Sequence, residues 1–246
     1  MLEVRDISKS FHTLTVAYQV SFTVPRGRRH AVIGPNGAGK TTLFNLIAGA
    51  LAPDAGSVIV DGVDVTAMSP DARVRAGLAR SFQHNNLFPD MTVRENLATA
   101  RAVHGGVAPV FWRPFWDFGE LLTEAEDLAR RIDVADHLDT PVRQLSYGTQ
   151  RQVEVGLALA LEPKVLLLDE PTAGMSPEET RAMRALIGGL PADLTIVIIE
   201  HDMDVVFGLA ERVTVLDYGT ILLEGTPAEM RASDVVRQRY LGGGTL

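Results

Sequence analysis

The chain has 246 residues, of which 46% are hydrophobic and 22% charged, and it contains no cysteine. Its formal net charge of -8 argues against a nucleic-acid binder that works through a basic face, although a few N–H groups and one lysine can still bind phosphate on an acidic protein. The lack of cysteine excludes disulfides, thiolate nucleophiles and cysteine-type zinc sites, and it fits a reducing cytosol.

The length fits one α/β domain with an embedded subdomain, so we expect residues 1–246 to form a single domain. The N-terminus has no apolar signal core. No apolar run approaches the roughly 20 residues needed to cross a bilayer. We therefore expect a globular, cytoplasmic chain.

The first quarter of the sequence predicts β-structure, a glycine-rich loop and a helix. Residues 21–24 alternate in polarity and residues 30–33 form a short apolar strand. Glycines then punctuate residues 34–39, and residues 41–50 have the apolar spacing of a helix. Residues 57–62 resemble a strand that ends in an Asp-Gly turn.

The middle of the chain is predicted to be helical. Over residues 93–139 an apolar stripe runs among acidic and basic side chains, which is typical of a helix lying on a core. We expect a helical insertion between about residues 91 and 143, within a helical subdomain that reaches to about residue 160.

The last part of the chain returns to strands. Residues 165–168 and 195–199 are continuous apolar runs, as expected of strands covered on both faces. Residues 213–216 and 221–223 flank a Tyr-Gly-Thr turn, and a helical tail follows. The pattern predicts an α/β fold with a mostly parallel sheet and helices on both faces.

The glycine-rich loop fits the phosphate-binding pattern G-x-x-x-x-G-K-[ST], with a strand before it and a helix after it as the motif requires. It reads Gly34-Pro35-Asn36-Gly37-Ala38-Gly39-Lys40-Thr41, followed by Thr42. Glycines let successive backbone N–H groups converge on phosphate oxygens, and the following helix adds its positive end. Lys40 is expected to reach the β- and γ-phosphates of a nucleotide, and the Thr41 hydroxyl to bind Mg²⁺.

The apolar strand at residues 165–168 ends in two carboxylates, Asp169 and Glu170. We expect Asp169 to lie near the Mg²⁺ and Glu170 near the γ-phosphate, where one carboxylate serves the metal and the other polarises the attacking water. A strand that ends in Asp-Glu is weak evidence alone, because acidic residues often mark where a strand reaches solvent. Together with the phosphate loop it is strong evidence.

Between these motifs lies a third one, Leu145-Ser146-Tyr147-Gly148-Thr149-Gln150, which leads into a helix. With these residues in place the sequence resembles the ATPase subunit of an ABC transporter, over essentially the whole chain. The motifs occur in the family's order, with Gln83 after the phosphate loop and His201 after the two carboxylates. The resemblance implies a P-loop NTPase core with an N-terminal antiparallel β-subdomain and an inserted helical subdomain.

The resemblance also implies a mechanism and its cofactors, ATP and Mg²⁺. Two ATPase subunits, identical or different, meet head to tail, and each ATP lies between the phosphate loop of one and the Ser146–Gly148 segment of the other. Ser146 and the Gly148 N–H would contact the partner's γ-phosphate, although a serine there is also an ordinary helix N-cap. Gln83 would complete the Mg²⁺ contacts and report the nucleotide state to a membrane partner. His201 would bond the γ-phosphate and hold the attacking water.

Several positions leave alternatives open. Phe11 matches the aromatic side chain that stacks on adenine, with Val16 beside it, but phenylalanine is also commonly buried in a core. The third and fifth positions of the family's Leu-Ser-Gly-Gly-Gln motif are Tyr147 and Thr149 here, and the usual Leu-Asp of the dimer-contacting loop is replaced by Met175-Ser176. The two groups aimed at phosphate remain, so catalysis is not obviously lost.

Residues 110–118 hold both tryptophans and several other aromatic residues. One interpretation is a hydrophobic plug that packs the helical insertion onto the core. The other is a contact surface for a membrane subunit. A membrane-surface helix fits less well, because the segment contains Pro114 and little positive charge.

The leading functional prediction is an ATP-hydrolysing motor at the cytoplasmic face of the membrane, bound to permease subunits and served indirectly by an extracytoplasmic substrate-binding protein. A soluble ABC ATPase acting on ribosomes or DNA fits less well, since such relatives usually carry two cassettes or a long coiled coil. A non-hydrolysing regulator is disfavoured by Glu170 and His201. Nucleic acid is not an expected partner.

The subfamily can be narrowed by resemblance. The Glu200–Met203 segment, the residues around Tyr218 and Glu224, and the end at 239–242 resemble subunits of branched-chain amino acid importers. The Gly174-Met175 pair also resembles urea importers of the same group. Import of branched-chain or other hydrophobic amino acids is therefore expected, with urea or a short amide as the alternative.

Overall fold

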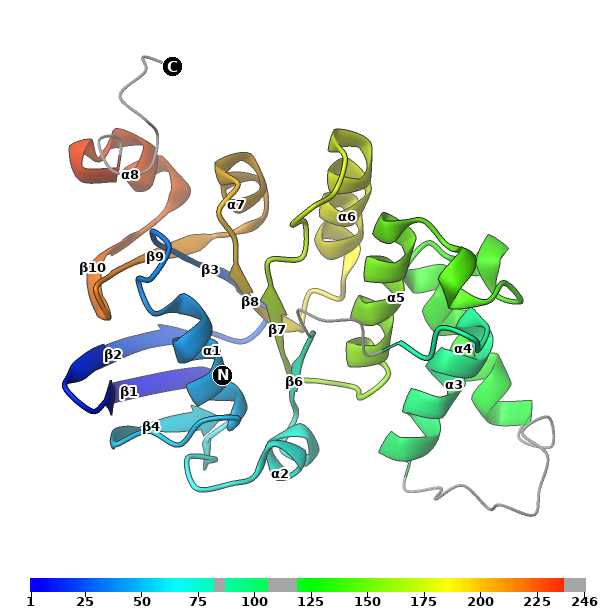
Figure 1. Cartoon of the computed structure of the whole chain (residues 1–246), viewed down its shortest axis with the longest axis horizontal. Coiled ribbons are helices and arrows are strands. Elements are labelled where there is room, and N and C mark those ends of the chain that lie inside the picture. Colours follow the sequence, from blue (N-terminus) through cyan, green and yellow to red (C-terminus); the bar gives the residue numbers. More distant parts are fainter. Residues whose placement is uncertain (82–86, 106–118, 237–246) are drawn as a thin grey trace.

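The computed structural model describes residues 1–81, 87–105 and 119–236, and two β-sheets organise them (Figure 1). One sheet is antiparallel with strand order β2-β1-β4-β5, and the other has the order β10-β9-β3-β8-β7-β6. In the second sheet β9, β3, β8, β7 and β6 run parallel, and β10 pairs antiparallel with β9. The strands are β1 Leu2–Phe11, β2 Leu14–Val24, β3 Arg29–Ile33, β4 Ala55–Val60, β5 Val63–Asp64, β6 Leu78–Arg80, β7 Val165–Asp169, β8 Thr195–Ile199, β9 Arg212–Asp217 and β10 Thr220–Gly225.

The helices include those that were predicted, and also three at 70–75, 177–189 and 203–209 that were not predicted. The helices are α1 Lys40–Ala48, α2 Pro70–Arg75, α3 Val93–His104, α4 Gly119–Arg131, η2 Ala135–His137, η3 Val142–Gln144, α5 Tyr147–Leu159, α6 Pro177–Gly189, α7 Met203–Leu209 and α8 Pro227–Ala232. The predicted mostly parallel sheet and the separate antiparallel N-terminal sheet are both confirmed. The predicted Asp-Gly turn is also confirmed, because β4 ends at Val60 and β5 begins at Val63.

Alternate residues of the central strands serve two different cores. In β7, Val165 and Leu167 pack with α1 and the antiparallel sheet, whereas Leu166 and Leu168 pack with residues of α5, α6 and α7. This alternation follows from the period of two along a strand, and it explains why the run is apolar throughout. One face of the parallel sheet is thus covered by α1 and the second sheet, and the other face by helices.

Helix α1 lies between the two sheets and is held at its C-terminus by a buried arginine. The guanidinium of Arg73 donates to the carbonyl oxygens of Leu46 and Ile47 at 2.7 and 2.6 Å. It also bonds the carbonyl oxygen of Thr66 at 2.7 Å, and the residue is 1% exposed. A cation at this end of a helix satisfies carbonyl groups that have no partner within the helix, and it opposes the negative end of the helix dipole.

Helices α3, α4 and α5 pack on one another at the side away from the antiparallel sheet (Figure 1). Their apolar residues belong to the same continuous core as Leu166 and Ile196 of the parallel sheet. The division into a core and a helical subdomain over about residues 91–160 stays a prediction. The aromatic segment at 110–118 lies outside the described residues. No helix in the described part of the chain is both long and apolar enough to span a bilayer.

Candidate nucleotide-binding and hydrolysis site

The predicted phosphate loop connects β3 to α1, and glycine is required at both of its ends. A Cβ atom on Gly34 would lie 2.3 Å from the carbonyl oxygen of Leu216, and one on Gly39 would lie 2.4 Å from that of Val16. Gly39 also has a φ of 99°, which side chains disfavour. Within the loop the Ala38 N–H donates to the Pro35 carbonyl oxygen at 3.1 Å. The loop is therefore a tight backbone turn wedged between β9 and β2.

The start of α1 differs from that of six other α-helices. Each of α2, α3, α5, α6, α7 and α8 follows a serine, threonine or aspartate whose side chain accepts an N–H of the first turn. Helix α1 follows Gly39 and has no such side-chain bond. Its first N–H groups have no partner within the helix, so they are left for an anion. Thr41 in this first turn is exposed, and Thr42 is half-buried.

Lys40 lies over its own loop. Its Nζ donates to the carbonyl oxygens of Gly34 and Pro35 at 2.7 and 3.0 Å. Burial lowers the pKa of Lys40 below its usual value, and the neighbouring carboxylates of Glu170 and Asp169 act in the opposite direction. The structure thus brings the predicted lysine and the two predicted carboxylates, 129 residues or more apart in the chain, into one electrostatic environment.

Asp169 is the last residue of β7, and its side chain is 0% exposed. Arg80 donates from Nη2 to its Oδ2 at 2.6 Å, and the same guanidinium donates from Nη1 to Asn45 of α1 at 2.6 Å. The other oxygen, Oδ1, is buried without a hydrogen-bond partner among the described residues. A buried carboxylate oxygen without a donor is costly unless something else, such as a metal-bound water, supplies one.

Glu170 lies just beyond the end of β7, at the turn where the chain leaves the sheet. Its N–H donates to the Ile199 carbonyl oxygen of β8 at 2.9 Å, and its φ of 47° is left-handed. The adjacent carboxylates differ in setting, since Asp169 is fully buried and Glu170 is half-buried.

His201 follows β8, and its side chain is 64% exposed. The side chain is therefore not packed in the core. Its backbone N–H donates to Oε2 of the fully buried Glu200 at 3.0 Å, and Oε1 of Glu200 accepts from the Thr172 N–H at 3.0 Å. Glu200 thereby joins the loop after β7 to the loop after β8, and no role was predicted for it.

Ser146 and Gly148 lie at the start of α5. Ser146 is the N-cap, and its Oγ accepts from the Thr149 N–H at 3.2 Å, so the N-cap interpretation is confirmed. Outside α5, their partner in the described part of the chain is Glu179 of α6 rather than any residue of the phosphate loop. Within one chain, the loop and this segment are separate surfaces.

The predicted adenine contact lies at the tip of the β1–β2 hairpin. Phe11 is 46% exposed, so the alternative that it packs in the core is wrong. Val16 is half-buried, and its carbonyl oxygen is the atom that Gly39 and Gly219 approach. This places the hairpin beside the phosphate loop. The contact with adenine stays a prediction, and Gln83 lies outside the described residues.

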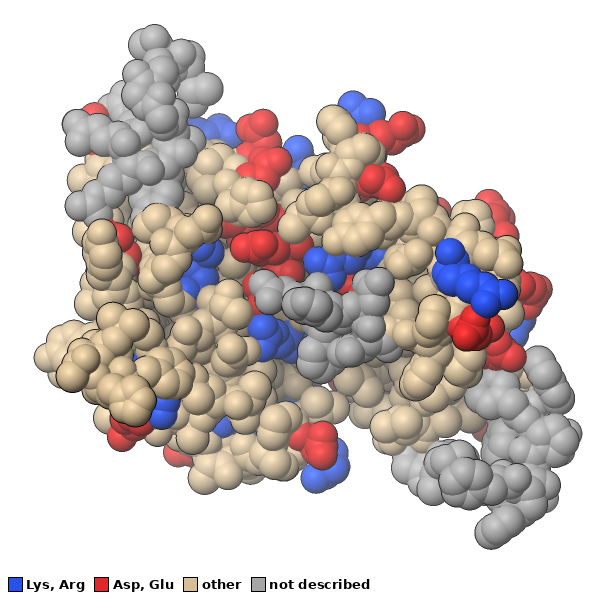
Figure 2. Space-filling model, in the orientation of Figure 1, with Lys and Arg blue, Asp and Glu red and all other residues tan. Residues whose placement is uncertain are grey.

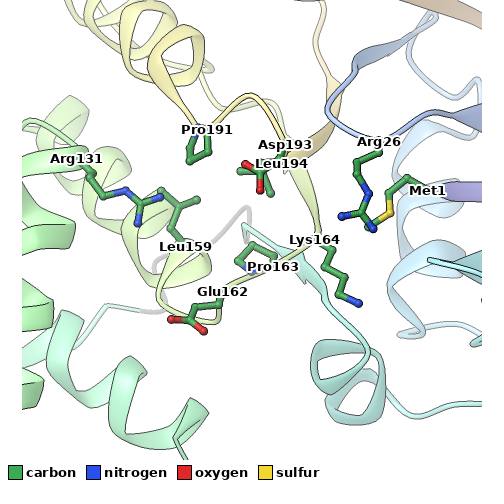
Figure 3. Close-up of a pocket in the computed structure, with 10 residues that line it drawn as sticks. All are labelled: Met1, Arg26, Arg131, Leu159, Glu162, Pro163, Lys164, Pro191, Asp193 and Leu194. Carbon is green, nitrogen blue, oxygen red and sulfur yellow. The ribbon is translucent and has the colours of Figure 1, made fainter.

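The surface carries a region of mixed charge (Figure 2) and a separate pocket. Figure 2 shows acidic side chains gathered at the middle of one face with basic side chains beside them, so the charge there is mixed. The pocket in Figure 3 lies apart from the predicted site, at the N-terminal ends of β7 and β8, where Lys164 precedes β7 and Leu194 precedes β8. It contains none of the predicted site residues.

Comparison with known proteins agrees with this geometry. The model of the ABC transporter family matches residues 17–173. The high-affinity branched-chain amino acid transport ATP-binding protein LivG of Salmonella typhimurium is 35% identical over 98% of each chain. The methionine import ATP-binding protein MetN of Caulobacter vibrioides is 38% identical over 97% of this chain and 71% of that protein.

A solved structure, the ADP conformation of an ATP-binding cassette of an ABC transporter, superposes with a TM-score of 0.86 at 29% identity, covering 98% of both chains. The match extends over the sheets and the helices alike, as its coverage shows. The chain belongs to the ABC transporter family and is an ATPase domain of that family.

Proposed function

We propose that this chain is the ATPase subunit of an importer for branched-chain or other hydrophobic amino acids. It works at the cytoplasmic face of the membrane on permease subunits, to which an extracytoplasmic binding protein delivers the substrate. ATP hydrolysis is supported above all by the start of α1. This helix has no side-chain cap, and its first residue, Lys40, lies in the electrostatic field of Asp169 and Glu170. Free N–H groups, one lysine and two carboxylates form a site for a phosphate chain that is to be hydrolysed.

The residues present fit Mg²⁺, which prefers oxygen ligands and keeps several waters. Asp169 Oδ1 is a buried acceptor without a partner among the described residues, and the Thr41 side chain is exposed at the helix start. We assign Thr41 and Asp169, together with Gln83, to hold the ion. When bound, Mg²⁺ neutralises charge on the phosphate oxygens.

The protein's own groups divide the remaining work. Glu170 is the base that accepts a proton from the attacking water. His201, with an exposed side chain at the end of β8, bonds the γ-phosphate and orients that water. Lys40 and the loop from Gly34 to Thr42 hold the phosphate chain, while Phe11 and Val16 contact the adenine.

The site is completed by a second subunit, identical or different. Ser146 and Gly148 do not contact the loop of their own chain in the described part, so they are available to the nucleotide of a neighbour. The N-terminus of α5 presents a hydroxyl and N–H groups, which suit a phosphate. ATP then lies between two subunits, and its binding closes the pair.

Replacing Ser146 with arginine tests the shared site. ATP binding by the isolated subunit should remain within about 2-fold of wild type, because Ser146 bonds the nucleotide of the neighbouring subunit. This hydrogen bond is absent in a single subunit, so its loss does not change the affinity there. Hydrolysis should collapse, and wild-type activity should rise more than linearly with protein concentration. Titration of ATPase rate against concentration checks this, and an active Ser146→Arg monomer with strictly linear activity would refute the shared site.

The substrate is tested by uptake in cells. The proposal of amino acid import is supported by the LivG relative and by the resemblances around Tyr218 and Glu224, whereas MetN, a methionine importer, has similar identity over most of the chain. Labelled leucine, isoleucine, valine, methionine and urea should be compared in cells with wild-type or Glu170→Gln protein. We expect loss of branched-chain uptake in the variant. Loss confined to urea would overturn the assignment to amino acids, loss confined to methionine would exclude the branched-chain amino acids, and no change in any import would overturn the importer itself.

A further inference from the structure

The carboxylate of Glu179 connects the start of α6 to the start of α5. Its Oε2 accepts the Ser176 N–H at 2.9 Å, which closes a capping box on α6. Its Oε1 accepts the Gly148 N–H at 3.0 Å and the Ser146 hydroxyl at 3.2 Å. The carboxylate therefore binds the two groups of the α5 N-terminus that the proposed function assigns to phosphate.

Helix capping does not account for this second set of bonds. In the capping boxes of α3 and α8, Glu95 and Glu229 use one oxygen for both the backbone N–H and the hydroxyl of the cap residue. Among the described residues neither glutamate bonds another helix through its second oxygen. Glu179 differs because its second oxygen reaches across to α5.

Gly148 makes room for this carboxylate. A Cβ atom at position 148 would lie 2.7 Å from both Cγ and Oε1 of Glu179. The hydrogen bonds from the Ser176 and Gly148 N–H groups lower the pKa of Glu179 below its ordinary value, so the group is an anion at neutral pH. An anion at a helix N-terminus occupies the position that favours negative charge.

We propose that Glu179 is a place-holder for the γ-phosphate. In the single subunit its Oε1 accepts from the Ser146 and Gly148 donors, and this oxygen must leave them when the neighbour's ATP binds. The inference rests on the proposed shared site. The Gly148 N–H and the Ser146 hydroxyl cannot donate fully to both the Glu179 carboxylate and a γ-phosphate. The two negative charges would also repel each other if both groups bound these donors. Glu179 therefore raises the ATP concentration at which two subunits close, and it prevents this surface from binding stray anions.

The variant Glu179→Gln removes the charge and keeps an oxygen for the cap, and Glu178→Gln is the matched control. Glu178 is exposed and lies in the same first turn of α6, so both changes alter the charge near that helix end equally. ATP-dependent dimer formation is measured by analytical ultracentrifugation with each change placed in the Glu170→Gln background. We expect Glu179→Gln to lower the half-saturating ATP concentration by about 2- to 5-fold, the range of one charge at a helix terminus, and Glu178→Gln to leave it unchanged.

A second variant and a stability measurement keep the outcomes distinct. Glu179→Ala vacates the donors entirely, so it should lower the ATP requirement at least as far as Glu179→Gln does, while its lost cap lowers the unfolding temperature. An unchanged or raised ATP requirement in both variants, with Glu178→Gln normal, would overturn the place-holder and leave the shared site standing. If no variant forms dimers at any ATP concentration, the shared site fails and the place-holder fails with it.

Discussion

Replacing Lys40 with alanine should weaken ATP binding by at least about 10²-fold and remove measurable hydrolysis, because charge-assisted bonds contribute about 1.5–3 kcal/mol each and Lys40 can make more than one. It is the only cation in residues 34–41. Its position is set in advance by bonds from Nζ to the Gly34 and Pro35 carbonyl oxygens. Fluorescent-nucleotide titration and a phosphate-release assay measure the two effects.

The matched control for this change is Lys164→Ala. Lys164 is half-exposed, bonds Asp61 at 2.6 Å, and lines the pocket at the N-terminal ends of β7 and β8. This variant loses a lysine and an ion pair without touching the loop, so its activity should stay near that of wild type. Near-normal ATP turnover in Lys40→Ala would mean that the loop is not the site of hydrolysis.

Replacing Glu170 with glutamine separates binding from chemistry. The amide keeps the size and polarity of the side chain but cannot accept the proton of water, so turnover should fall by about 10²–10⁴-fold. ATP should still bind, since Lys40 and the start of α1 are untouched. Subunits that bind but do not hydrolyse should accumulate as ATP-bound dimers, visible by size-exclusion chromatography with Mg²⁺ present.

Glu162→Gln serves as the control for that loss of a carboxylate. Glu162 is exposed, pairs with Arg101, and lies in the connection that precedes β7. It should hydrolyse ATP at the wild-type rate and show no excess of dimers. Wild-type turnover in Glu170→Gln, under the same conditions, would assign the base to another residue.

The fold was largely predictable because its elements follow local patterns. The apolar runs of β7 and β8 predicted buried strands, and the glycine loop between a strand and a helix predicted the start of α1. The assignment of faces was not predictable. Val165 and Leu166 are both apolar, so the sequence does not show that one contacts α1 and the other α5 and α6.

Some residues of the candidate site could likewise be predicted from the sequence, and others could not. Lys40, Asp169 and Glu170 were found because each belongs to a contiguous motif with a known chemistry. Arg80 was missed because its bond to Asp169 spans 89 residues and a basic residue at a strand end has no pattern of its own. Glu200 and Glu179 were missed because each bonds a partner from a distant segment of the chain. The sequence did hold one indication of the role of Glu200, which lies directly between an apolar strand and His201. A carboxylate that is buried at such a position needs a hydrogen-bonding partner.

The unequal ends of α1 have a consequence for the chain as a whole. The protein neutralises the negative pole of this helix with its own Arg73 and leaves the positive pole to whatever anion enters. Nucleotide thus supplies the missing N-cap of a helix that lies between the two sheets. Because nucleotide binds the folded chain at this helix, nucleotide binding should raise the free energy of unfolding of the subunit.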